Sequence, residues 1–344
     1  MRPRSRFQVV ESKVDCPFKN AVLMTKSTEI FGIDISKDVF DVFSLEMGHH
    51  QFSNNETGFK QFIKKLSKAS LVVMEATGYY YYCLAQYLYE KGYAVSVVNP
   101  LSVKRFIQMK LSKIKTDKSD AKSICEYGRN NEVPLYTAKD KNQAECLQIL
   151  RLIDTFIKHR TAIKNKLDGE KVLGVPSKAV YRSLGRTVKH LNKEIAVLET
   201  RLGSLVKEEQ QEQLTLLKTI PGIGEKAAIL LVVFTDGFSK FENSKQLCCY
   251  AGITPTIRQS GSSVRGRSRI SKIGNKKLRN QLFLSSFTAC QYNKACRELF
   301  ERIVEQGKSK KLALLAVCNK LLKQAFAIAK SGLPYNENFV SKLV

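Results

Sequence analysis

The 344-residue sequence has little of what histidine and thiolate metal sites are built from. It holds four histidines, His49, His50, His159 and His190, and they are scattered, so we expect neither a histidine-ligated metal nor a histidine base. Its nine cysteines form no CxxC pair and no Cys/His array with zinc spacing. We therefore predict that the cysteines are small, reduced core residues of a cytosolic protein.

Long apolar runs are also missing. No stretch of 18 apolar residues occurs, and the basic start MRPRSRFQVVESK lacks the apolar segment that a signal peptide needs. The sequence therefore predicts neither a membrane span nor a signal peptide. Residues 1–28 have no clear periodicity, and we interpret them as a tail, or as an upstream extension of a start at Met24.

Acidic residues are few in relation to basic ones. There are 57 Lys and Arg against 31 Asp and Glu, which gives a formal net charge of +26. A balance of this kind is typical of nucleic-acid-binding proteins, although it indicates a partner and not an activity. With 43% hydrophobic residues, the chain is long enough to form two or three globular domains.

Residues 29–138 alternate between strand and helix patterns. The runs EIFGIDIS, VFDVFSLE and HHQFSN predict three strands, and NETGFKQFIKKLSK predicts a helix capped by Asn or Thr. The strand SLVVME, a helix through YYYYCLAQYLYEKG, the strand AVSVVNP and a further helix follow. This order predicts an α/β domain with a mixed sheet and helices on both faces, as in the RNase H and RuvC nuclease folds.

The rest of the chain is predicted to be mostly helical. Residues 139–214 indicate two long helices that link two domains or form an oligomer interface, because one of them carries a coiled-coil-like seam. Residues 215–344 begin with LKTIPGIGEKAAILL, in which PGIG resembles the hairpin of a helix-hairpin-helix. Gly222 and Gly224 would let backbone N–H groups approach a phosphate, unless they form a plain helix connection.

Four acids are the candidate metal ligands. Asp117 and Asp120, in KIKTDKSDAK, are three residues apart and would share one face of a helix. Asp34 and Glu75 each end an apolar strand, where this topology brings side chains to one edge of the sheet. Four such carboxylates suit Mg²⁺ or Mn²⁺ in phosphoryl transfer. The alternatives are ion-pair partners for the neighbouring lysines, or simple turn residues.

A second candidate region is basic and rich in serine. Residues 258–282 contain no acid and would attract a phosphate backbone. Ser260, before Gly261, could approach a phosphodiester as a nucleophile, or could only donate a hydrogen bond to a phosphate. The predicted nucleic-acid-binding cations are Lys113, Lys115, Lys118, Lys122, Arg258, Arg265, Arg267, Arg269, Lys272, Lys276, Lys277 and Arg279.

These motifs together resemble the insertion sequence 110 family of transposases, relatives of the Piv-type DNA invertases. The resemblance extends over residues 29–332, through GIDISKD, MEATG, KTDKSDA, IPGIG, YAGITP and RQSGSSVRGRSRISKIGNKKLR. It implies a RuvC-like domain at 29–138, a helical or coiled-coil linker at 139–214 and a transposase domain at 215–344.

The family's site residues can be assigned by position. The resemblance implies an Asp-Glu-Asp-Asp metal site at Asp34, Glu75, Asp117 and Asp120. It also implies a nucleophilic serine at Ser260, with Ser262 and Ser263 as second choices because many members read Ser-Gly-Gly where this chain reads QSGSS.

The predicted function is excision and insertion of a mobile DNA element, guided by a structured bridge RNA, through a covalent phosphoserine. The alternatives are a site-specific DNA invertase, a hydrolytic Holliday-junction nuclease, and a nucleic-acid-binding protein without catalysis. The expected partners are DNA, the bridge RNA and further copies of the chain in a dimer or tetramer, in the bacterial cytoplasm at the nucleoid. The tyrosines of GYYYY either stack on bases or lie half-buried on a helix.

Overall fold

The structure, a computed structural model, describes residues 29–110, 116–138, 140–174, 177–257, 259–260, 264–266 and 269–338. The predicted tail at 1–28 lies outside the described residues, and Gln259, Ser260, Val264 and Arg265 are described by their backbone alone. The chain divides into two compact units, one up to Lys139 and one from Asp140. We refer to them as the N-terminal unit and the C-terminal unit.

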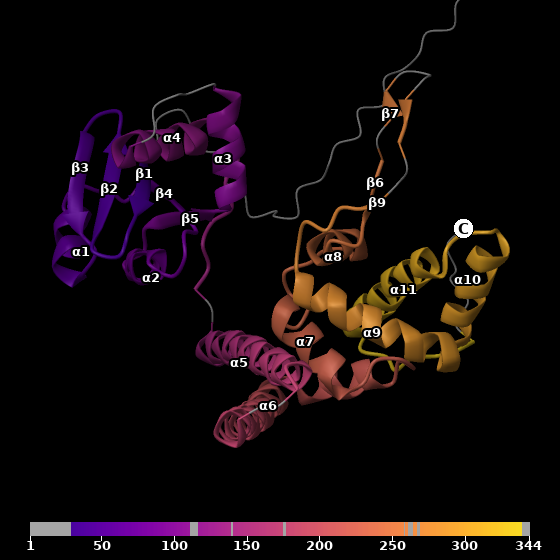
Figure 1. Ribbon diagram of the computed structural model, residues 1–344. Helices are drawn as coiled ribbons and strands as arrows, with labels where there is room; N and C mark the ends of the chain where they lie inside the picture. The colour runs from indigo at the N-terminus through magenta and orange to yellow at the C-terminus, as the bar shows by residue number, and fades with distance from the viewer. Residues whose placement is uncertain are drawn as a thin grey trace, which may run out of the picture. The chain divides into compact units, whose positions relative to one another are not determined.

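The N-terminal unit contains the predicted mixed sheet (Figure 1). The strand order is β3-β2-β1-β4-β5, with β2 antiparallel to β1 and β3, and with β1, β4 and β5 parallel. The order of strands and helices predicted from the sequence is confirmed. The strands are β1 (Ile30–Ile35), β2 (Val39–Ser44), β3 (Gly48–Ser53), β4 (Leu71–Glu75) and β5 (Ala94–Val98).

Helices cover both faces of this sheet, because alternate residues of its buried strands are apolar in both directions. On one face α1 (Glu56–Ile63) and α2 (Tyr81–Glu90) pack on Phe31, Ile33 and Phe40. On the other face α3 (Pro100–Met109) and α4 (Asp117–Asn130) pack on Ile30, Val73 and Val98. The predicted cap of the first helix is Asn55, whose side chain accepts a hydrogen bond from Gly58 N.

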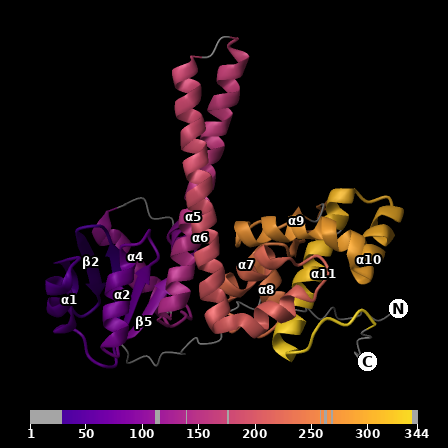
Figure 2. The same ribbon diagram turned by 90° about the horizontal axis from the view of Figure 1, so that it is seen from below.

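The C-terminal unit begins with a long helical hairpin of α5 (Lys141–Val172) and α6 (Lys178–Lys218), seen from the side in Figure 2. The seam predicted from the sequence packs within this chain, since Ile195, Leu202 and Leu205 of α6 share a core with Ile149 and Ile153 of α5. Gln210 has non-helical backbone angles and bends α6.

Five further helices complete one hydrophobic core with the base of the hairpin. They are α7 (Glu225–Thr235), α8 (Ser244–Ala251), α9 (Lys276–Tyr292), α10 (Lys294–Glu305) and α11 (Lys310–Ser331). By length and composition, α11 is the one helix in the described part of the chain that could cross a membrane. In this structure α11 is a core helix of the C-terminal unit. Its residues Val317, Leu321 and Ala325 are buried in the cluster that the other helices share.

A two-stranded ribbon leaves this core between α8 and α9 (Figure 1). We call β6 to β9 the serine ribbon: β6 (Pro255–Thr256) pairs with β9 (Arg269–Ile270), and β7 (Gln259–Ser260) pairs with β8 (Val264–Arg265).

The two ends of the serine ribbon are held at one point of the core. Gly252 and Gly274 have positive φ, and a Cβ on Gly274 would lie 2.3 Å from Tyr250 O. Asn275 N donates to the same Tyr250 oxygen at 2.7 Å, and its side chain caps α9. The glycines of the YAGITP and SKIGNKK stretches therefore close the base of the ribbon by direct backbone contact.

Candidate active site

Helix α4 lies directly on β1 because β1 contains a glycine at the contact. A Cβ on Gly32 would be 2.2 Å from Cys125 N and 2.3 Å from Ala121 O, both of α4. The Cys125 thiol also donates to Ile30 O at 3.1 Å. Only glycine permits so close an approach of helix and strand backbones.

The direction of α4 follows from a second glycine. A Cβ on Gly128 would lie 2.7 Å from Val73 Cγ2 and 3.2 Å from Ile30 Cγ2, so the later part of α4 covers the beginning of β1. The first turn of α4, beyond Ala121, is therefore directed toward the carboxyl ends of β1 and β4. Asp117 and Asp120 belong to that first turn.

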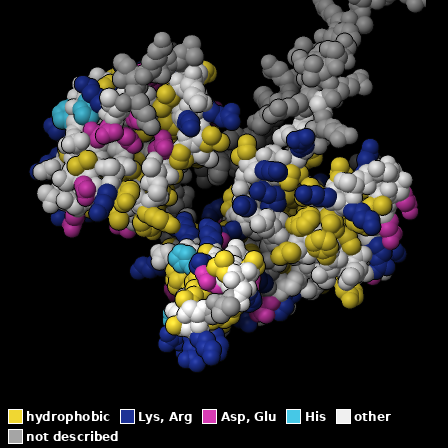
Figure 3. Space-filling model, in the orientation of Figure 1, with side chains coloured by type: hydrophobic (Ala, Val, Ile, Leu, Met, Phe, Trp, Pro, Cys, Tyr) yellow, Lys and Arg dark blue, Asp and Glu magenta, His cyan; other side chains and the backbone are white. Residues whose placement is uncertain are grey.

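Asp34 and Glu75 occupy these two strand ends. Residues alternate in direction along a strand, so Asp34 shares the α4 face with Ile30 and Gly32, and Glu75 shares it with Val73. The register Ile33↔Met74 makes Asp34 and Glu75 the next residues along two neighbouring parallel strands. The space-filling view shows acidic side chains gathered on the N-terminal unit (Figure 3).

The electrostatics of Asp34 reflect this arrangement. The pKa of its half-buried carboxyl is raised from 3.8 to about 6, first because burial disfavours the charged form. The negative charges of Asp120, Asp117, Glu75 and Asp41 then raise this pKa further, in that order. Three of these four neighbours are the acids that the sequence pattern selects.

Local hydrogen bonds fix the elements that carry the acids. Thr116 caps α4 in a reciprocal capping box: its side chain accepts from Ser119 N at 3.2 Å, and its backbone N donates to Ser119 Oγ at 2.8 Å. The Thr77 hydroxyl donates to Glu75 Oε1 at 3.1 Å just after β4. The N-terminal dipole of α4 favours negative charge at Asp117 and Asp120.

The donor set suits a hard divalent cation, since carboxylate oxygens are the ligands that Mg²⁺ and Mn²⁺ prefer. Among the described residues no three His, Cys, Asp or Glu side chains are close enough together to enclose a metal ion as they stand. The charges of Asp120, Asp117 and Glu75 add to burial in raising the pKa of Asp34, which is a repulsion between like charges. A cation between them would remove it.

Sequence reasoning missed a fifth acid beside the site. Asp41 of β2 lies opposite Asp34 in the antiparallel register and is buried. It accepts hydrogen bonds from Gln51 Nε2 and lies 2.7 Å from His49 Nε2. The available signal was an acid inside the otherwise apolar run VFDVF, with the polar residues His49 and Gln51 on the same face of β3.

Surface groups around the acids are partly as predicted. Lys118 and Lys122 are exposed on α4, whereas Lys113 and Lys115 lie outside the described residues. Of the tyrosines that follow Glu75, Tyr79 and Tyr80 are 69% and 46% exposed, and Tyr81 packs partly into the core. Base stacking thus remains open to Tyr79 and Tyr80, and the half-buried alternative holds for Tyr81.

The predicted serine site is described only in part. The backbone of Ser260 pairs with Val264 in the serine ribbon. Gly261, Ser262, Ser263, Arg258 and Arg267 lie outside the described residues, and the side chains of Ser260 and Arg265 are not described.

The remaining basic residues of this region fall into two groups. Arg269, Lys272 and Lys276 are exposed, as a phosphate contact requires. Lys277 instead donates to Leu150 O at 3.0 Å and lies 3.5 Å from Asp154 Oδ2, and burial lowers its pKa. Arg279 donates to Ala251 O at 2.8 Å. These last two side chains therefore also hold α9 to α5 and α8.

The predicted hairpin glycines have different surroundings. Gly222 has φ 104 and lies against α9, where a Cβ would be 2.7 Å from Ala289 Cβ. Gly224 is exposed and precedes the first turn of α7 without a side-chain cap. Gly222 is thus explained by packing, and Gly224 leaves backbone N–H groups of α7 open to solvent.

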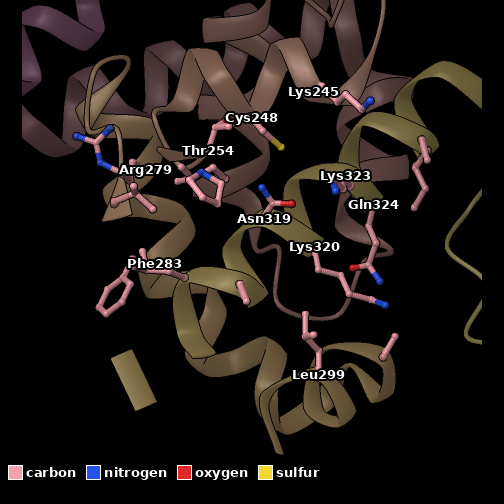
Figure 4. Close-up of a pocket in the computed structure, with 18 of the residues that line it drawn as sticks. Lys245, Cys248, Thr254, Arg279, Phe283, Leu299, Asn319, Lys320, Lys323 and Gln324 are labelled. Carbon is pink, nitrogen blue, oxygen red and sulfur yellow. The ribbon is translucent and has the colours of Figure 1, made fainter. Parts of the chain in front are cut away.

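A cavity of about 2550 Å³ lies among α8, α9, α10, α11 and the segment after α11 (Figure 4). Its wall is mainly apolar, including Phe283 and Leu299, while Lys245, Lys320 and Lys323 line it with their ammonium groups. Glu337 is the one acid among its described lining residues. Sequence reasoning missed this cavity, whose signal was a group of polar residues in the middle of α11, namely Asn319, Lys320, Lys323 and Gln324.

Comparisons with known proteins give a consistent result. Residues 31–172 match a family model described as a transposase, and residues 214–301 match the transposase IS116/IS110/IS902 family. The pilin gene-inverting protein of Moraxella lacunata is 29% identical over 324 residues, which are 90% of this chain and 98% of that protein. The transposase for insertion sequence element IS1111A of Coxiella burnetii is 24% identical over 292 residues, 77% of this chain and 79% of that protein.

Proposed function

Because this chain belongs to the IS110 family of transposases, enzymes that cleave and rejoin DNA, we propose that its four acids on α4 and at the ends of β1 and β4 hold a divalent metal ion at the site of DNA cleavage. The observation that carries this proposal is the geometry: the parallel ends of β1 and β4 and the first turn of α4 bring the four acids to one edge of the sheet, and the charges of the other three contribute, after burial, to the raised pKa of Asp34. A cation shared by the four acids would offset the negative charges that raise the pKa of Asp34.

A bound Mg²⁺ or Mn²⁺ would supply Lewis-acid activation of an attacking oxygen and neutralise charge on a leaving oxygen. The contribution of the chain is to hold its carboxylates on two adjacent strands and one helix turn, which are fixed by Gly32 and by the Thr116 capping box. Lys118, Lys122 and the exposed ring of Tyr79 would hold the nucleic acid beside them.

In the proposed reaction Ser260 is the nucleophile. Its Oγ forms a bond to phosphorus while the bond from phosphorus to one DNA oxygen breaks, and the serine proton is passed to that leaving oxygen. Attack of a new DNA hydroxyl on the phosphoserine reverses these steps and rejoins the strands, so no net hydrolysis occurs. The acids and the serine act on one phosphodiester, within one chain or between copies of a dimer or tetramer.

We propose that a structured bridge RNA guides excision and insertion of the mobile element by pairing with both DNA partners, in the bacterial cytoplasm where the chromosome lies. Site-specific inversion is a second candidate, because the alignment with the pilin gene-inverting protein extends over 98% of that protein. Activity of the purified chain on its DNA only when the element's non-coding RNA is added supports the first; activity that survives ribonuclease supports the second.

The C-terminal unit supports nucleic-acid binding beyond the serine ribbon. Lys245, Lys320 and Lys323 line the cavity of Figure 4 together with Arg269 and Lys272. Ammonium groups around an apolar wall can hold phosphates while bases contact the wall.

The test of the serine mechanism is a protein–DNA adduct that survives denaturation. We expect the Ser260→Ala chain to form no adduct and no rejoined product, because the hydroxyl that attacks phosphorus is absent. Ser262→Ala and Ser263→Ala are matched controls that should keep the adduct. An adduct on the Ser260→Ala chain would refute the assignment, and nicked products without any adduct in the wild type would instead indicate a hydrolytic nuclease.

A further inference from the structure

The outer half of the α5–α6 hairpin carries a strong positive charge that has no part in the proposed metal and serine sites. Residues 171–193 contain six Lys or Arg and no Asp or Glu. Lys and Arg side chains are seen gathered at the end of the hairpin in the space-filling view (Figure 3). The part of α6 that follows, from Glu194 to Lys218, holds five acids against three basic residues.

Five of these cations form a stripe along one face of α6. They follow one another at spacings of four, four, three and four residues, which keeps them on one side of a helix. Their side chains are all exposed, and the stripe is about 22 Å long at 1.5 Å per residue. We call this set the α6 basic stripe: Lys178, Arg182, Arg186, Lys189 and Lys193.

The α6 basic stripe faces away from α5. The positions that are buried or half-buried on α6 include Tyr181, Leu184, Val188 and Leu191, which form the face toward α5. At 100° per residue the stripe is centred on the opposite side of the helix. The stripe residues are therefore not part of the apolar contact between α5 and α6.

The stripe cations have no acidic partner in the described part of the chain. On the hairpin, carboxylates pair with other cations, as in Lys158–Asp154 at 3.0 Å, Lys166–Glu170 at 2.6 Å and Lys171–Asp168 at 2.8 Å. An ordinary solvated helix face mixes both signs, because like charges four residues apart disfavour the helix.

The stripe is also unfavourable for the helix end on which it lies. Lys178 is the first residue of α6, the first turn has no acid, and Ser177 makes no side-chain capping bond. Positive charge at a helix N-terminus opposes the helix dipole. An anion on this face would relieve both the dipole conflict and the repulsion between the cations.

We propose that the α6 basic stripe binds the phosphate backbone of a nucleic-acid duplex. Two arginines at its centre, Arg182 and Arg186, can each donate two hydrogen bonds to one phosphate. The stripe contains no aromatic ring on which single-stranded bases could stack, which favours a duplex backbone. The partner is a DNA or an RNA duplex, since both present the same phosphates. The proposal does not depend on the metal site or on Ser260.

The test compares two triple variants of the full chain, without divalent metal so that no cleavage occurs. R182Q/R186Q/K189Q removes the centre of the stripe, whereas R201Q/K207Q/K226Q removes three exposed cations that are paired with acids. Both lose the same charge, and glutamine is well tolerated in helices. Affinity is measured by fluorescence anisotropy for a DNA duplex and for an RNA duplex between about 50 and 200 mM salt.

We expect the stripe variant to bind about 10- to 100-fold more weakly near 100 mM salt, with a salt slope smaller by about two to three for DNA. The control variant should bind within about threefold of wild type. A loss with the DNA duplex, the RNA duplex or both supports the proposal and identifies the strand type. Equal affinity and equal slopes for the two triple variants on both duplexes would overturn it.

A charge-preserving variant guards against a folding defect. R182K/R186K should keep the wild-type salt slope, because each lysine still releases one counterion, and should lose only part of the affinity. The thermal unfolding temperature of R182Q/R186Q/K189Q should be no lower than that of the wild type, since removal of like charges relieves repulsion along the helix. A slope for R182K/R186K as low as that of the triple glutamine variant would contradict charge as the cause.

Discussion

At the scale of single residues, Asp34 shows most directly what the site requires. Its carboxyl is half-buried at the end of β1 and its pKa is raised to about 6 by burial and by four negative neighbours. The charged form of this carboxylate therefore lowers the free energy of unfolding. That loss disappears when a cation binds, so the stability of the metal-free protein and its affinity for metal are linked at this position.

We predict that Asp34→Asn stabilises the metal-free protein at pH 7.5. A folded-state pKa raised from 3.8 to about 6 means that the wild type loses stability as pH rises from about 4 to above 6. Two pKa units correspond to about 3 kcal/mol, and screening at a half-exposed carboxyl reduces the expected gain to about 1–2 kcal/mol. Urea unfolding in EDTA at pH 7.5 and pH 4 measures it, and the gain should vanish at pH 4.

The matched control is Asp38→Asn, the same change at an exposed turn beyond the end of β1. It should leave stability unchanged within about 0.5 kcal/mol. Added Mg²⁺ should raise the melting temperature of the wild type and of this control, and not that of Asp34→Asn. A metal-free Asp34→Asn chain less stable than the wild type would contradict the electrostatic account.

The sequence places the four acids at strand and helix ends, and the structure confirms those places, while their role as metal ligands stays a prediction. The sequence does not show that Lys277 and Arg279 contact the protein, because they lie in the same run of basic residues as the exposed Lys276. Their partners, Leu150 O and Ala251 O, are backbone oxygens far away in the chain. Only the packing of α9 on α5 and α8 decides which lysine faces solvent and which faces protein.

At the scale of elements, the contact between α4 and β1 determines whether the acids meet. The hydrophobic pattern predicts the strand and the helix, but not where one crosses the other. That position is set by Gly32 and Gly128, which permit close contact at two points. A glycine within a strand run gives no such information from sequence alone, because it is equally compatible with a bulge or a turn.

We predict that Gly32→Ala displaces α4 and lowers the stability of the N-terminal unit by about 2–3 kcal/mol, since the new methyl would lie 2.2 Å from Cys125 N. The shift would also carry Asp117 and Asp120 away from the strand ends, so Mg²⁺ should no longer raise the melting temperature. Thermal unfolding with and without Mg²⁺ measures both effects.

Gly169→Ala is the contrasting substitution. Gly169 lies inside α5, and no atom lies within 4 Å of the place that a Cβ would take, so alanine should add about 0.5–1 kcal/mol through helix propensity. If Gly32→Ala behaved in the same way as Gly169→Ala, the close helix–strand contact would not be the constraint that we infer.

At the scale of the whole molecule, the two units have separate cores. The clusters around Phe31 and around Ile30 contain residues of the N-terminal unit alone, and the cluster around Leu217 contains residues from Cys146 onward. The sequence indicates the change from alternating to helical patterns near residue 139. It leaves open whether the long helices are a separate linker, and the structure places their buried residues in the C-terminal core.

We predict that residues 29–138 fold by themselves, because their buried apolar groups contact one another and the sheet is covered on both faces. The fragment should unfold in a single cooperative transition in urea and should gain stability from Mg²⁺ in the same way as the full chain. The Gly32→Ala fragment is the control and should not respond to Mg²⁺. A non-cooperative transition of the unaltered fragment would show that the core requires the C-terminal unit.

The contacts at the base of the serine ribbon determine which part of the ribbon can vary in length. Entry and exit of the ribbon meet at Tyr250, Gly252 and Gly274, so both ends are fixed to one spot of the helical core. Residues added or removed between Thr256 and Arg269 would leave the backbone contacts at Tyr250, Gly252 and Gly274 unchanged. The number of residues in the serine ribbon can therefore change without any change in the contacts that hold its two ends to the helical core.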